Sequence, residues 1–360
     1  MRIIQIIDSL DAGGAERMAV SFANALANEI EFSALVATRK EGNLRNQIND
    51  NVPYLFLNKK KTIDFIALNK LRNYVRKNKI EIVHAHGTSF FFAFLLKLIC
   101  PSVKLIWHDH YGARAKQSKM DNHILLMASL FFSAIFVVNL EMKRWSESIL
   151  FTKKVTFIPN FAENSNLKTG HTTLKGQSGK RIVCVANLKK PKNHIAILYA
   201  FNELQLHKVG WSLHFIGKDF YDDYSSELKD YIKINELNNF VFIYDAQNDI
   251  QHILSQATIG ILASTNEGFP VALLEYGLVK LAVASTNVGY CSTLITHNFS
   301  GLLFHPHDNE ELKEQLNILT SNAEIRLQIG LNLHQEVIKK YSKEKIIQLL
   351  LQEYKSIKAQ

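Results

Sequence analysis

Two kinds of segment alternate along this sequence, and the alternation constrains the fold more than any other feature. Short apolar, β-branched runs such as "RIIQIID" (2–8) and "EIVHAH" (81–86) are followed by amphipathic runs of helical spacing, such as residues 15–28 and 64–78. This order predicts parallel strands joined by helices in a doubly wound sheet. The fold class expected is therefore α/β.

The alternation pauses once and then starts again. A polar stretch at 163–179 contains few apolar residues, and strand-like runs resume at "RIVCVAN" (181–187). Such a stretch is typical of a linker between domains. We therefore expect two Rossmann-like domains, residues 1–162 and 180–342, joined by a linker at 163–179. The 360 residues, of which 47% are apolar, suffice for two buried cores.

The cysteines and the N-terminus indicate a reducing compartment. Cys100, Cys184 and Cys291 are far apart and form no CxxC pair, so neither a disulfide framework nor a zinc site is expected. The first apolar run is interrupted by Gln5 and Asp8, which suits a buried strand better than a secretory signal. A cytoplasmic protein is expected.

One uncharged apolar segment approaches the length of a membrane span. Residues 124–140, "ILLMASLFFSAIFVVNL", are rich in Leu, Met and Ala in their first half and β-branched in their second. This change favours a core helix at 123–133 that runs into a buried strand. The run at 90–100 is too short to span a membrane and contains Lys97, so it is also expected to be a core helix.

The net charge of +9 belongs to the first half of the chain. Residues 1–160 contain 22 Lys and Arg against 13 Asp and Glu, whereas residues 161–360 contain 20 of each. Basic clusters such as "KKK" (59–61) predict an anionic partner there, either a membrane surface, a phosphorylated acceptor or nucleic acid. Because the basic half contains no recognisable nucleic-acid module, no nucleic-acid partner is expected.

Two glycines follow the first predicted strand. Gly13 and Gly14 precede an amphipathic run, so they are placed at a helix N-terminus, where backbone N–H groups can approach a phosphate. A tight turn without a ligand is the alternative. The stretch lacks GxGxxG and GK[ST], which disfavours a dehydrogenase or a P-loop NTPase.

The stretch "STNEGFPVALLEYG" (264–277) also follows a predicted strand. Pro270 suits the first turn of a helix, which leaves Glu267 in the preceding loop and Glu275 about five residues inside the helix, roughly 8 Å further along its axis. The helix N-terminus between the two carboxylates can bind a phosphate or sugar hydroxyls. A glycosidase acid and base pair is the alternative, but this spacing disfavours convergence on one bond.

Several motifs together make the chain resemble a known family. They are "GGAER" (13–17), "VHAHG" (83–87), "HDH" (108–110), "FIPN" (157–160), "VANLKKPKNH" (185–194), "EGFPVALLE" (267–275) and "NFSGLLFHPHD" (298–308). The sequence is similar over nearly its whole length to the retaining nucleotide-sugar glycosyltransferases of family four, which carry a Glu-x7-Glu signature. The resemblance implies the GT-B fold of two Rossmann-like domains facing a cleft, with a last helix at about 343–360 that returns to the first domain.

The resemblance implies roles for the two carboxylates. Glu275 would bind the ribose hydroxyls of the donor nucleotide. Glu267 would hold the donor sugar, together with the backbone of Gly268, Phe269 and Pro270. Glu267 is accordingly a catalytic candidate.

The family pattern also implies how the diphosphate is held. Lys192 would stabilise the leaving group, and Gly13 and Gly14 would contribute N–H groups. Asn187 stands where many members have an arginine, so one phosphate cation is missing, and Lys189 or Lys190 is the candidate substitute. No metal and no cofactor are expected.

Three histidines and an arginine complete the implied site. His110 aligns with the family histidine near the transferred sugar, and His108 is the alternative for that role. His86, His108 and Arg114 are expected on the acceptor side.

The resemblance thus implies a cytoplasmic enzyme at the inner face of the cell membrane. It would move a hexose from a nucleoside diphosphate sugar, UDP-linked, to a glycan or lipid-linked acceptor in cell-surface polysaccharide synthesis, with retention and by same-face attack. Anionic membrane contact is expected through the basic N-terminal domain. The alternatives are a nucleotide-sugar 2-epimerase of the same fold and a catalytically silent sugar-binding relative.

Overall fold

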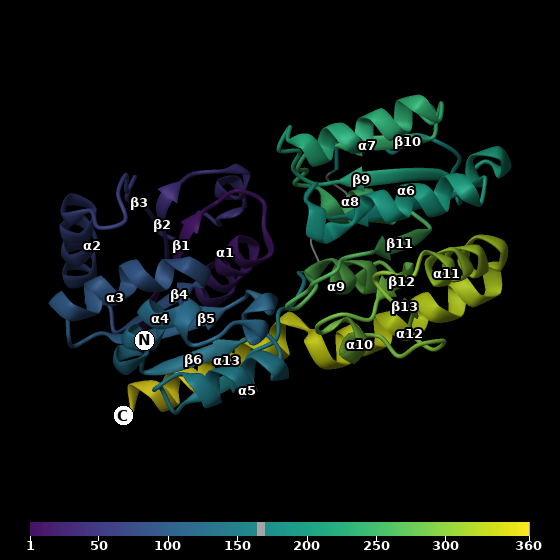
Figure 1. Ribbon diagram of the computed structural model, residues 1–360. Helices are drawn as coiled ribbons and strands as arrows, with labels where there is room; N and C mark the ends of the chain where they lie inside the picture. The colour runs from purple at the N-terminus through teal and green to yellow at the C-terminus, as the bar shows by residue number, and fades with distance from the viewer. Residues whose placement is uncertain (164–169, 360) are drawn as a thin grey trace. The chain divides into compact units, whose positions relative to one another are not determined.

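A computed structural model describes residues 1–163 and 170–359 (Figure 1). Of the predicted linker at 163–179, residues 164–169 lie outside the described residues. The chain divides into two compact units. Unit 1 comprises Met1–Phe161 together with Lys343–Gln360, and unit 2 comprises Ala162–Ser342. Each unit is an α/β layer structure built on one parallel sheet, which confirms the predicted fold class.

In the described part of unit 1, seven parallel strands form a sheet in the order β3-β2-β1-β4-β5-β6-β7. The strands are β1 (Arg2–Ser9), β2 (Phe32–Lys40), β3 (Tyr54–Phe56), β4 (Ile82–His86), β5 (Lys104–Asp109), β6 (Ala134–Val137) and β7 (Val155–Phe157). The strand order reverses between β1 and β4, so the carboxyl ends of these two strands flank the point where doubly wound sheets bind ligands.

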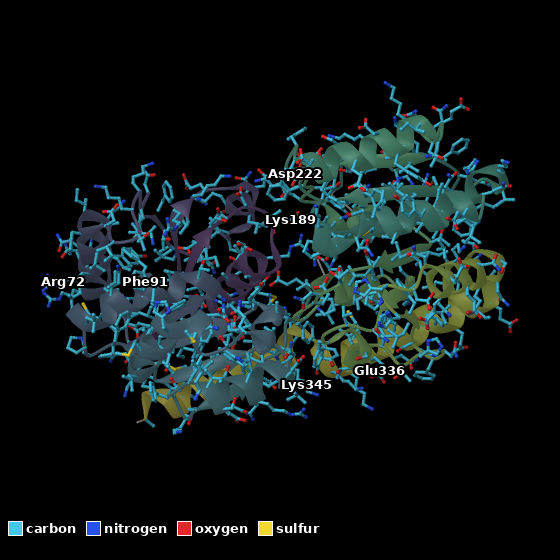
Figure 2. All side chains as sticks on the ribbon, viewed as in Figure 1. Arg72, Phe91, Lys189, Asp222, Glu336 and Lys345 are labelled. Carbon is cyan, nitrogen blue, oxygen red and sulfur yellow. The ribbon has the colours of Figure 1, made fainter. Side chains whose placement is uncertain are left out.

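Helices cover this sheet. They are α1 (Gly14–Leu26), α2 (Phe65–Lys77), α3 (Phe90–Ile99), α4 (His123–Ala128), α5 (Leu140–Ile149) and α13 (Lys343–Lys358). The short 3-10 segments are Asn43–Gln47, Gly87–Ser89, Gly112–Lys116, Met120–Asn122 and Ser129–Phe131. Helix α2 packs on α3 and α3 packs on α4, and Figure 2 labels Arg72 on α2 and Phe91 on α3. Helix α13 packs on α1 and buries Leu350, Tyr354 and Ile357 in this unit.

The apolar segment at 124–140 forms a short helix and a strand. Strand β6 is fully buried, as predicted. The prediction of a core helix at 123–133 is wrong in two respects. Helix α4 ends at Ala128, and its Ile124 and Met127 are 48% and 59% exposed. In the described part of the chain, no helix has both the length and the apolar composition needed to cross a membrane.

Unit 2 repeats the plan with six described parallel strands in the order β10-β9-β8-β11-β12-β13. They are β8 (Arg181–Val185), β9 (Ser212–Ile216), β10 (Val241–Tyr244), β11 (Ile259–Leu262), β12 (Ala282–Thr286) and β13 (Leu302–Phe304). The helices are α6 (His194–Glu203), α7 (Asp223–Ile234), α8 (Ile250–Ser255), α9 (Val271–Leu278), α10 (Cys291–Leu294), α11 (Asn309–Ser321) and α12 (Ala323–Tyr341), with 3-10 turns at Lys190–Lys192 and Leu206–Val209. The order reverses between β8 and β11.

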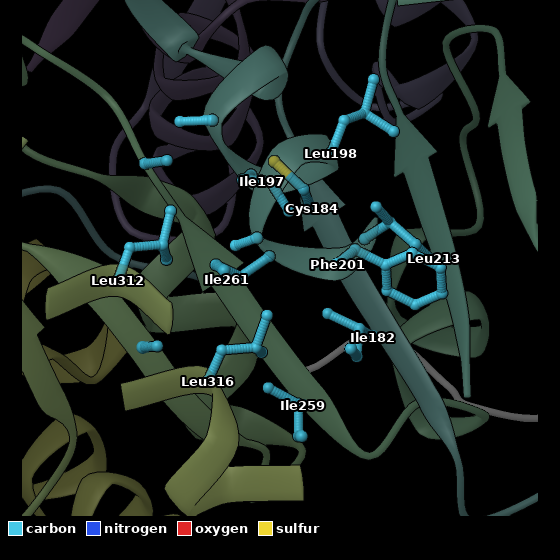
Figure 3. Packing of buried hydrophobic residues seen from close by; sticks show 14 of the residues in the cluster. Ile182, Cys184, Ile197, Leu198, Phe201, Leu213, Ile259, Ile261, Leu312 and Leu316 are labelled. Atoms are coloured by element: carbon cyan, nitrogen blue, oxygen red, sulfur yellow. The ribbon is translucent and has the colours of Figure 1, made fainter. Parts of the chain in front are cut away.

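The core of unit 2 lies between its sheet and its helices. Strand residues such as Ile182 and Ile261 meet Phe201 of α6 and Leu316 of α11, all without exposed surface (Figure 3). Burial of each such side chain contributes on the order of 1.5 to 3 kcal/mol. This packing fixes the strand ends from which the candidate site residues project.

Candidate active site

The loop between β11 and α9 positions Glu267 in unit 2. Pro270 was predicted in the first turn of the helix, but it is the N-cap of α9, one position before the helix begins, with φ −78° and ψ 97°. Glu275 is therefore the fifth residue of the helix, as predicted, and it is 7% exposed. The two carboxylates thus lie on either side of the helix N-terminus, where free backbone N–H groups favour negative charge.

An ion pair joins two of the predicted site residues. Lys192 Nζ lies 2.6 Å from Glu267 Oε1, and Ser264 Oγ donates a hydrogen bond of 2.7 Å to the same oxygen. The Lys192 side chain is 30% exposed and that of Glu267 is 9% exposed. The backbone N–H of Thr265 also donates to the carbonyl of Pro191 at 2.8 Å, so the two loops are held together by their main chains.

Gly289 allows the Glu267 loop its position, and sequence reasoning missed this residue. Its φ is +55°, and a Cβ added there would lie 1.8 Å from the carbonyl oxygen of Glu267. Thr286, at the end of β12, donates from Oγ1 to the carbonyl of Ser264 at 2.8 Å. The sequence does show a glycine soon after a predicted strand. It does not show that this glycine contacts a loop more than twenty residues earlier, because that contact forms only in the folded chain.

Buried aromatic residues hold the chain segments that carry the two carboxylates. Phe269 is buried and stacks on Tyr290, with ring centroids 4.7 Å apart, and its edge meets Tyr341 at 5.5 Å. Tyr276, next to Glu275, is fully buried and accepts a 2.8 Å hydrogen bond from the backbone N–H of Val185. Burial raises the pKa of Tyr276 well above its usual value, so it remains a neutral hydroxyl. The backbone next to each carboxylate is therefore fixed by a buried aromatic side chain.

Asn187 performs a structural task after β8. Its Oδ1 accepts a 3.0 Å hydrogen bond from the backbone N–H of Lys218, which joins the loops after β8 and β9. The Lys189 ammonium, labelled in Figure 2, lies 4.5 Å from the centroid of the Phe220 ring, and Lys218 lies 5.3 Å from the same ring. These lysines therefore add positive charge to the loops after β8 and β9, and Lys189 directly precedes the 3-10 turn that contains Lys192.

The two N-terminal glycines begin α1 of unit 1, as the sequence predicted. Gly13 is the N-cap with extended backbone. A Cβ on Gly13 would lie 2.2 Å from Glu16 Oε2, whereas one on Gly14 would meet no atom of the described residues within 4 Å. The open approach is therefore over Gly14, and the Glu16 carboxylate lies close to Gly13.

Four histidines form two hydrogen-bonded pairs: two lie on β4, one on β5, and His110 directly follows β5. His84 Nε2 lies 3.2 Å from His108 Nδ1, and His86 Nδ1 lies 3.0 Å from His110 Nε2. The pairs stack on each other, with centroids 4.5 Å apart for His84 and His86 and 4.2 Å for His108 and His110. The sequence reasoning identified three of these residues and missed His84, although it shares the alternate spacing of "VHAHG".

Burial decides the charge of this cluster. His84, His86 and His108 have no exposed surface, so the predicted acceptor-side residues His86 and His108 contact His110 rather than solvent. Burial, with repulsion from neighbouring histidines, lowers the pKa of all three well below the usual value. Burial also lowers the pKa of His110 to about 3. All four rings are therefore neutral at neutral pH.

Arg114, also predicted on the acceptor side, pairs with a buried carboxylate. Its Nε lies 2.5 Å from Asp109 Oδ2, and its Nη1 donates to Asn122 Oδ1 at 2.8 Å. Burial raises the pKa of Asp109 to about 6, and the Arg114 charge opposes that rise. The arginine is 12% exposed and braces the loop after β5, beside His110.

Metal ligands were not expected in this chain. Among the described residues, His84, His86 and His108 offer nitrogens within 4.8 Å of one another, close enough to share an ion. Those of His84 and His86 are already engaged, because each ring has partners at both nitrogens. The cluster therefore fits a hydrogen-bonded network better than a metal centre.

Comparisons with known proteins agree on one class. The family model "Glycosyltransferase Family 4" matches residues 12–164, and "Glycosyl transferases group 1" matches residues 172–336. An uncharacterized glycosyltransferase of Haemophilus influenzae is 24% identical, with 94% of this chain and 95% of that protein covered. The UDP-Gal:alpha-D-GlcNAc-diphosphoundecaprenol alpha-1,3-galactosyltransferase of Escherichia coli is 22% identical, with 91% and 92% covered.

A solved structure shares the fold of this chain. Anabaena HepE, in complex with UDP and glucose, superposes with a TM-score of 0.83 at 15% sequence identity. The match covers 99% of this chain and 100% of that one. At this identity the likeness concerns the fold.

Proposed function

Because the chain belongs to the GT-B glycosyltransferases, we propose that it moves a hexose from a UDP-linked sugar to a glycan or lipid-linked acceptor with retention of configuration. The Lys192–Glu267 ion pair at the N-terminus of α9 carries this proposal. A cation for a departing diphosphate and a carboxylate for sugar hydroxyls are both required for such a transfer, and here they are neighbours.

In this proposal, binding of the donor breaks the Lys192–Glu267 ion pair and gives each residue a new partner. The diphosphate takes the place of Glu267 beside the Lys192 ammonium. Glu267 then accepts hydrogen bonds from the sugar, and the buried Glu275 accepts them from the ribose hydroxyls. Hydrogen bonds to a charged group contribute about 1.5 to 3 kcal/mol each, which is enough to compensate for the lost ion pair.

The chemistry proposed is a same-face displacement. The bond between the anomeric carbon and the diphosphate oxygen breaks, the acceptor hydroxyl oxygen bonds to that carbon, and its proton passes to the departing diphosphate. Lys192 and the α9 N-terminus stabilise the negative charge that develops on the leaving group. No metal is required in this scheme, because fixed positive groups supply the stabilisation.

The acceptor is proposed to be attached to an anionic membrane, at the inner face of the cell membrane. Of the twenty exposed large apolar side chains among the described residues, thirteen lie in residues 63–151 of unit 1. The start of α2 and the segment before it combine such side chains with positive charge, since Ile63, Phe65 and Ile66 are 48%, 77% and 86% exposed beside the exposed Lys60 and Lys61. These five residues are called the α2 patch.

The α2 patch has the chemistry of a membrane-contact surface. An inserted Phe or Ile contributes about 1.5 to 3 kcal/mol, and each lysine near an anionic surface contributes about 1 kcal/mol. The patch also follows the end of β3, at the carboxyl edge of the sheet. His86 and Asp109 are the last residues of β4 and β5 at the same edge. A lipid-linked acceptor would thus reach unit 1 from the surface that the patch contacts.

A screen of nucleotide sugars by thermal shift, followed by incubation with each donor that binds, tests this function. The expected result is a rise in melting temperature with one or a few donors, because a ligand that binds only the folded state stabilises it. Conversion of the donor alone into an epimer would instead favour an epimerase. Binding without turnover in the presence of acceptor would favour a silent relative.

A further inference from the structure

Gln5 lies at the centre of a polar network that sequence reasoning did not identify. It is fully buried in the middle of β1, the strand next to β4. Its Oε1 lies 2.8 Å from His86 Nε2, and its Nε2 donates to Tyr354 Oη at 3.3 Å. Tyr354 comes from the last helix, α13, and its hydroxyl lies 2.6 Å from His84 Nδ1.

We propose that Gln5 and Tyr354 are positioning residues that fix the tautomers of the four histidines, so that His110 presents an unprotonated Nδ1 as a hydrogen-bond acceptor for a ligand hydroxyl. The tautomer assignment follows from hydrogen-bond directions alone. That the ligand is a transferred sugar or its acceptor rests on the proposed function.

The first branch of the network runs from Gln5 to His110. An amide oxygen only accepts hydrogen bonds, so His86 must carry its proton on Nε2. The other nitrogen of this neutral ring, Nδ1, is then an acceptor. His110 must therefore donate to it from Nε2–H, which leaves the lone pair of His110 Nδ1 unused. That atom is buried and has no hydrogen-bond partner among the described residues.

The second branch runs from Gln5 through Tyr354. The tyrosine oxygen accepts from the Gln5 amide, so its single proton is donated to His84 Nδ1. His84 therefore carries its proton on Nε2 and donates to His108 Nδ1. His108 is in turn protonated on Nε2, a buried nitrogen that has no hydrogen-bond partner among the described residues.

Both branches lead to one common state, in which all four rings are protonated on Nε2. Rotation of the Gln5 amide by 180° would reverse every hydrogen bond and place all four protons on Nδ1. His110 would then offer a donor, and His108 Nε2 would be a bare lone pair. The orientation of the Gln5 amide in the structure, with Oε1 toward His86 and Nε2 toward Tyr354, selects the first state. One buried amide therefore determines whether His110 accepts or donates.

The network also confines any proton uptake to one atom. A second proton on His84, His86 or His108 would occupy a nitrogen that already accepts a hydrogen bond, and that bond would be lost. A buried group left without its partner costs about 1 to 3 kcal/mol. His110 Nδ1 is the one histidine nitrogen of the network that can accept a hydrogen bond or a proton without such a loss.

Long-range proton–nitrogen NMR correlations of the full chain labelled with ¹⁵N-histidine test the proposal directly, since they distinguish the two neutral tautomers. All four rings are expected in the Nε2–H form. In Tyr354→Phe, only the signals of His84 and His108 should change. In Gln5→Met, those of His86 and His110 should change as well. His214, paired with Ser212 in unit 2, is the control and should keep its signals in both variants.

Two results would overturn the assignment. One is an Nδ1–H tautomer for His110 in the wild-type chain. The other is a change of the wild-type spectrum on treatment with EDTA, because the nitrogens would then be metal ligands. The spectrum requires no turnover, so it decides the tautomers even if no donor is ever transferred.

A kinetic readout tests the functional part. If His110 Nδ1 accepts a ligand hydroxyl, Gln5→Met should lower turnover about tenfold while the affinity for free nucleoside diphosphate stays within twofold of wild type, since that ligand lacks the sugar. Tyr354→Phe should lower turnover less than Gln5→Met does, because His86 keeps its hydrogen bond with Gln5 in that variant. Equal losses in the two variants would show that Gln5 acts only through packing.

Discussion

The Lys192 ammonium lies 2.6 Å from the Glu267 carboxylate, although the two residues are 75 positions apart in the sequence. Each therefore neutralises the other in the unliganded protein. The lysine is held at the site without being buried as an unpaired charge, which would be costly. A diphosphate that displaces the carboxylate finds its cation already in place.

Substitutions in this pair should separate donor binding from turnover. Glu267→Gln removes the competing anion, so affinity for free nucleoside diphosphate should stay near wild type or rise, while turnover falls at least tenfold. Glu275→Gln should weaken nucleoside diphosphate binding by about tenfold, since hydrogen bonds to a charged acceptor are lost. Lys192→Ala should lower both affinity and turnover, the latter by about a hundredfold. Calorimetry and initial rates measure these effects.

The result that contradicts this division of roles is a simple one. If Glu267→Gln weakens nucleoside diphosphate binding as much as Glu275→Gln does, Glu267 does not face the sugar. Ser264→Ala serves as a further check, because Ser264 donates to the same Glu267 oxygen and its loss should have a smaller effect of the same kind.

Gly289→Ala should disturb the Glu267 loop. The new Cβ would overlap the Glu267 carbonyl oxygen. In addition, the backbone φ of +55° at Gly289 is unfavourable for alanine by about 1 kcal/mol. The matched control is Gly179→Ala, because Gly179 has φ +82° but a Cβ there would meet no atom of the described residues within 4 Å. Urea unfolding should show a larger loss of stability for Gly289→Ala, together with a loss of turnover that the control does not share. Equal stability losses would mean that the close approach is unimportant.

Vesicle binding tests the α2 patch. Co-sedimentation with anionic vesicles should fall at least tenfold for the double change Phe65→Ser and Ile66→Ser, and the Lys60→Ala and Lys61→Ala pair should reduce both binding and its salt dependence. The control pair is Ile234→Ser and Leu327→Ser in unit 2, which removes side chains that are 79% and 65% exposed. Equal binding to neutral vesicles, or an equal loss in the control, would rule out the patch as the contact surface.

The buried histidines predict a loss of stability in acid. A histidine whose pKa is lowered by folding binds its proton more tightly in the unfolded chain. Its contribution to the stability of the fold is therefore fully present above the pKa in the unfolded chain, about 6.5, and is lost as the pH falls toward the pKa in the folded chain. For His110 that window extends to about pH 3, and His84, His86 and His108 act in the same direction.

The expected slope can be measured by urea unfolding between pH 7 and 5. Each such histidine lowers the free energy of unfolding by up to about 1.4 kcal/mol per pH unit below 6.5. Asp109, whose pKa is raised to about 6, has the opposite effect on the free energy of unfolding, but it is one group against four histidines. A free energy of unfolding that stays level or rises as the pH falls to 5 would contradict the burial of neutral rings.

Much of the fold could be predicted because strand and helix periodicity are local. The run at 2–8 is β1, the glycine pair begins α1, and Glu275 is the fifth residue of α9. Each of these depends on the pattern of apolar residues within one segment. The exposure of Ile124 and Met127 could not be predicted, since an apolar residue that is left uncovered has the same local pattern as a buried one.

The contacts that complete the site are non-local. Lys192 meets Glu267, Gly289 meets the Glu267 carbonyl, and Gln5 meets Tyr354 across 349 positions. Each contact depends on which loops and strands become neighbours after the sheets form. The sequence therefore identified residues of the right chemistry but not the partners that set their charge and direction.

Transfer of the sugar itself is the most direct test of the central claim. A UDP-sugar that passes the thermal-shift screen is incubated with a diphospholipid-linked acceptor in the presence of EDTA, and the anomeric configuration of the product is read from its proton NMR coupling. We predict an α-linked product from an α-linked donor, formed at an undiminished rate in chelator. A β-linked product, or turnover that is lost in EDTA and restored by magnesium, would contradict the account.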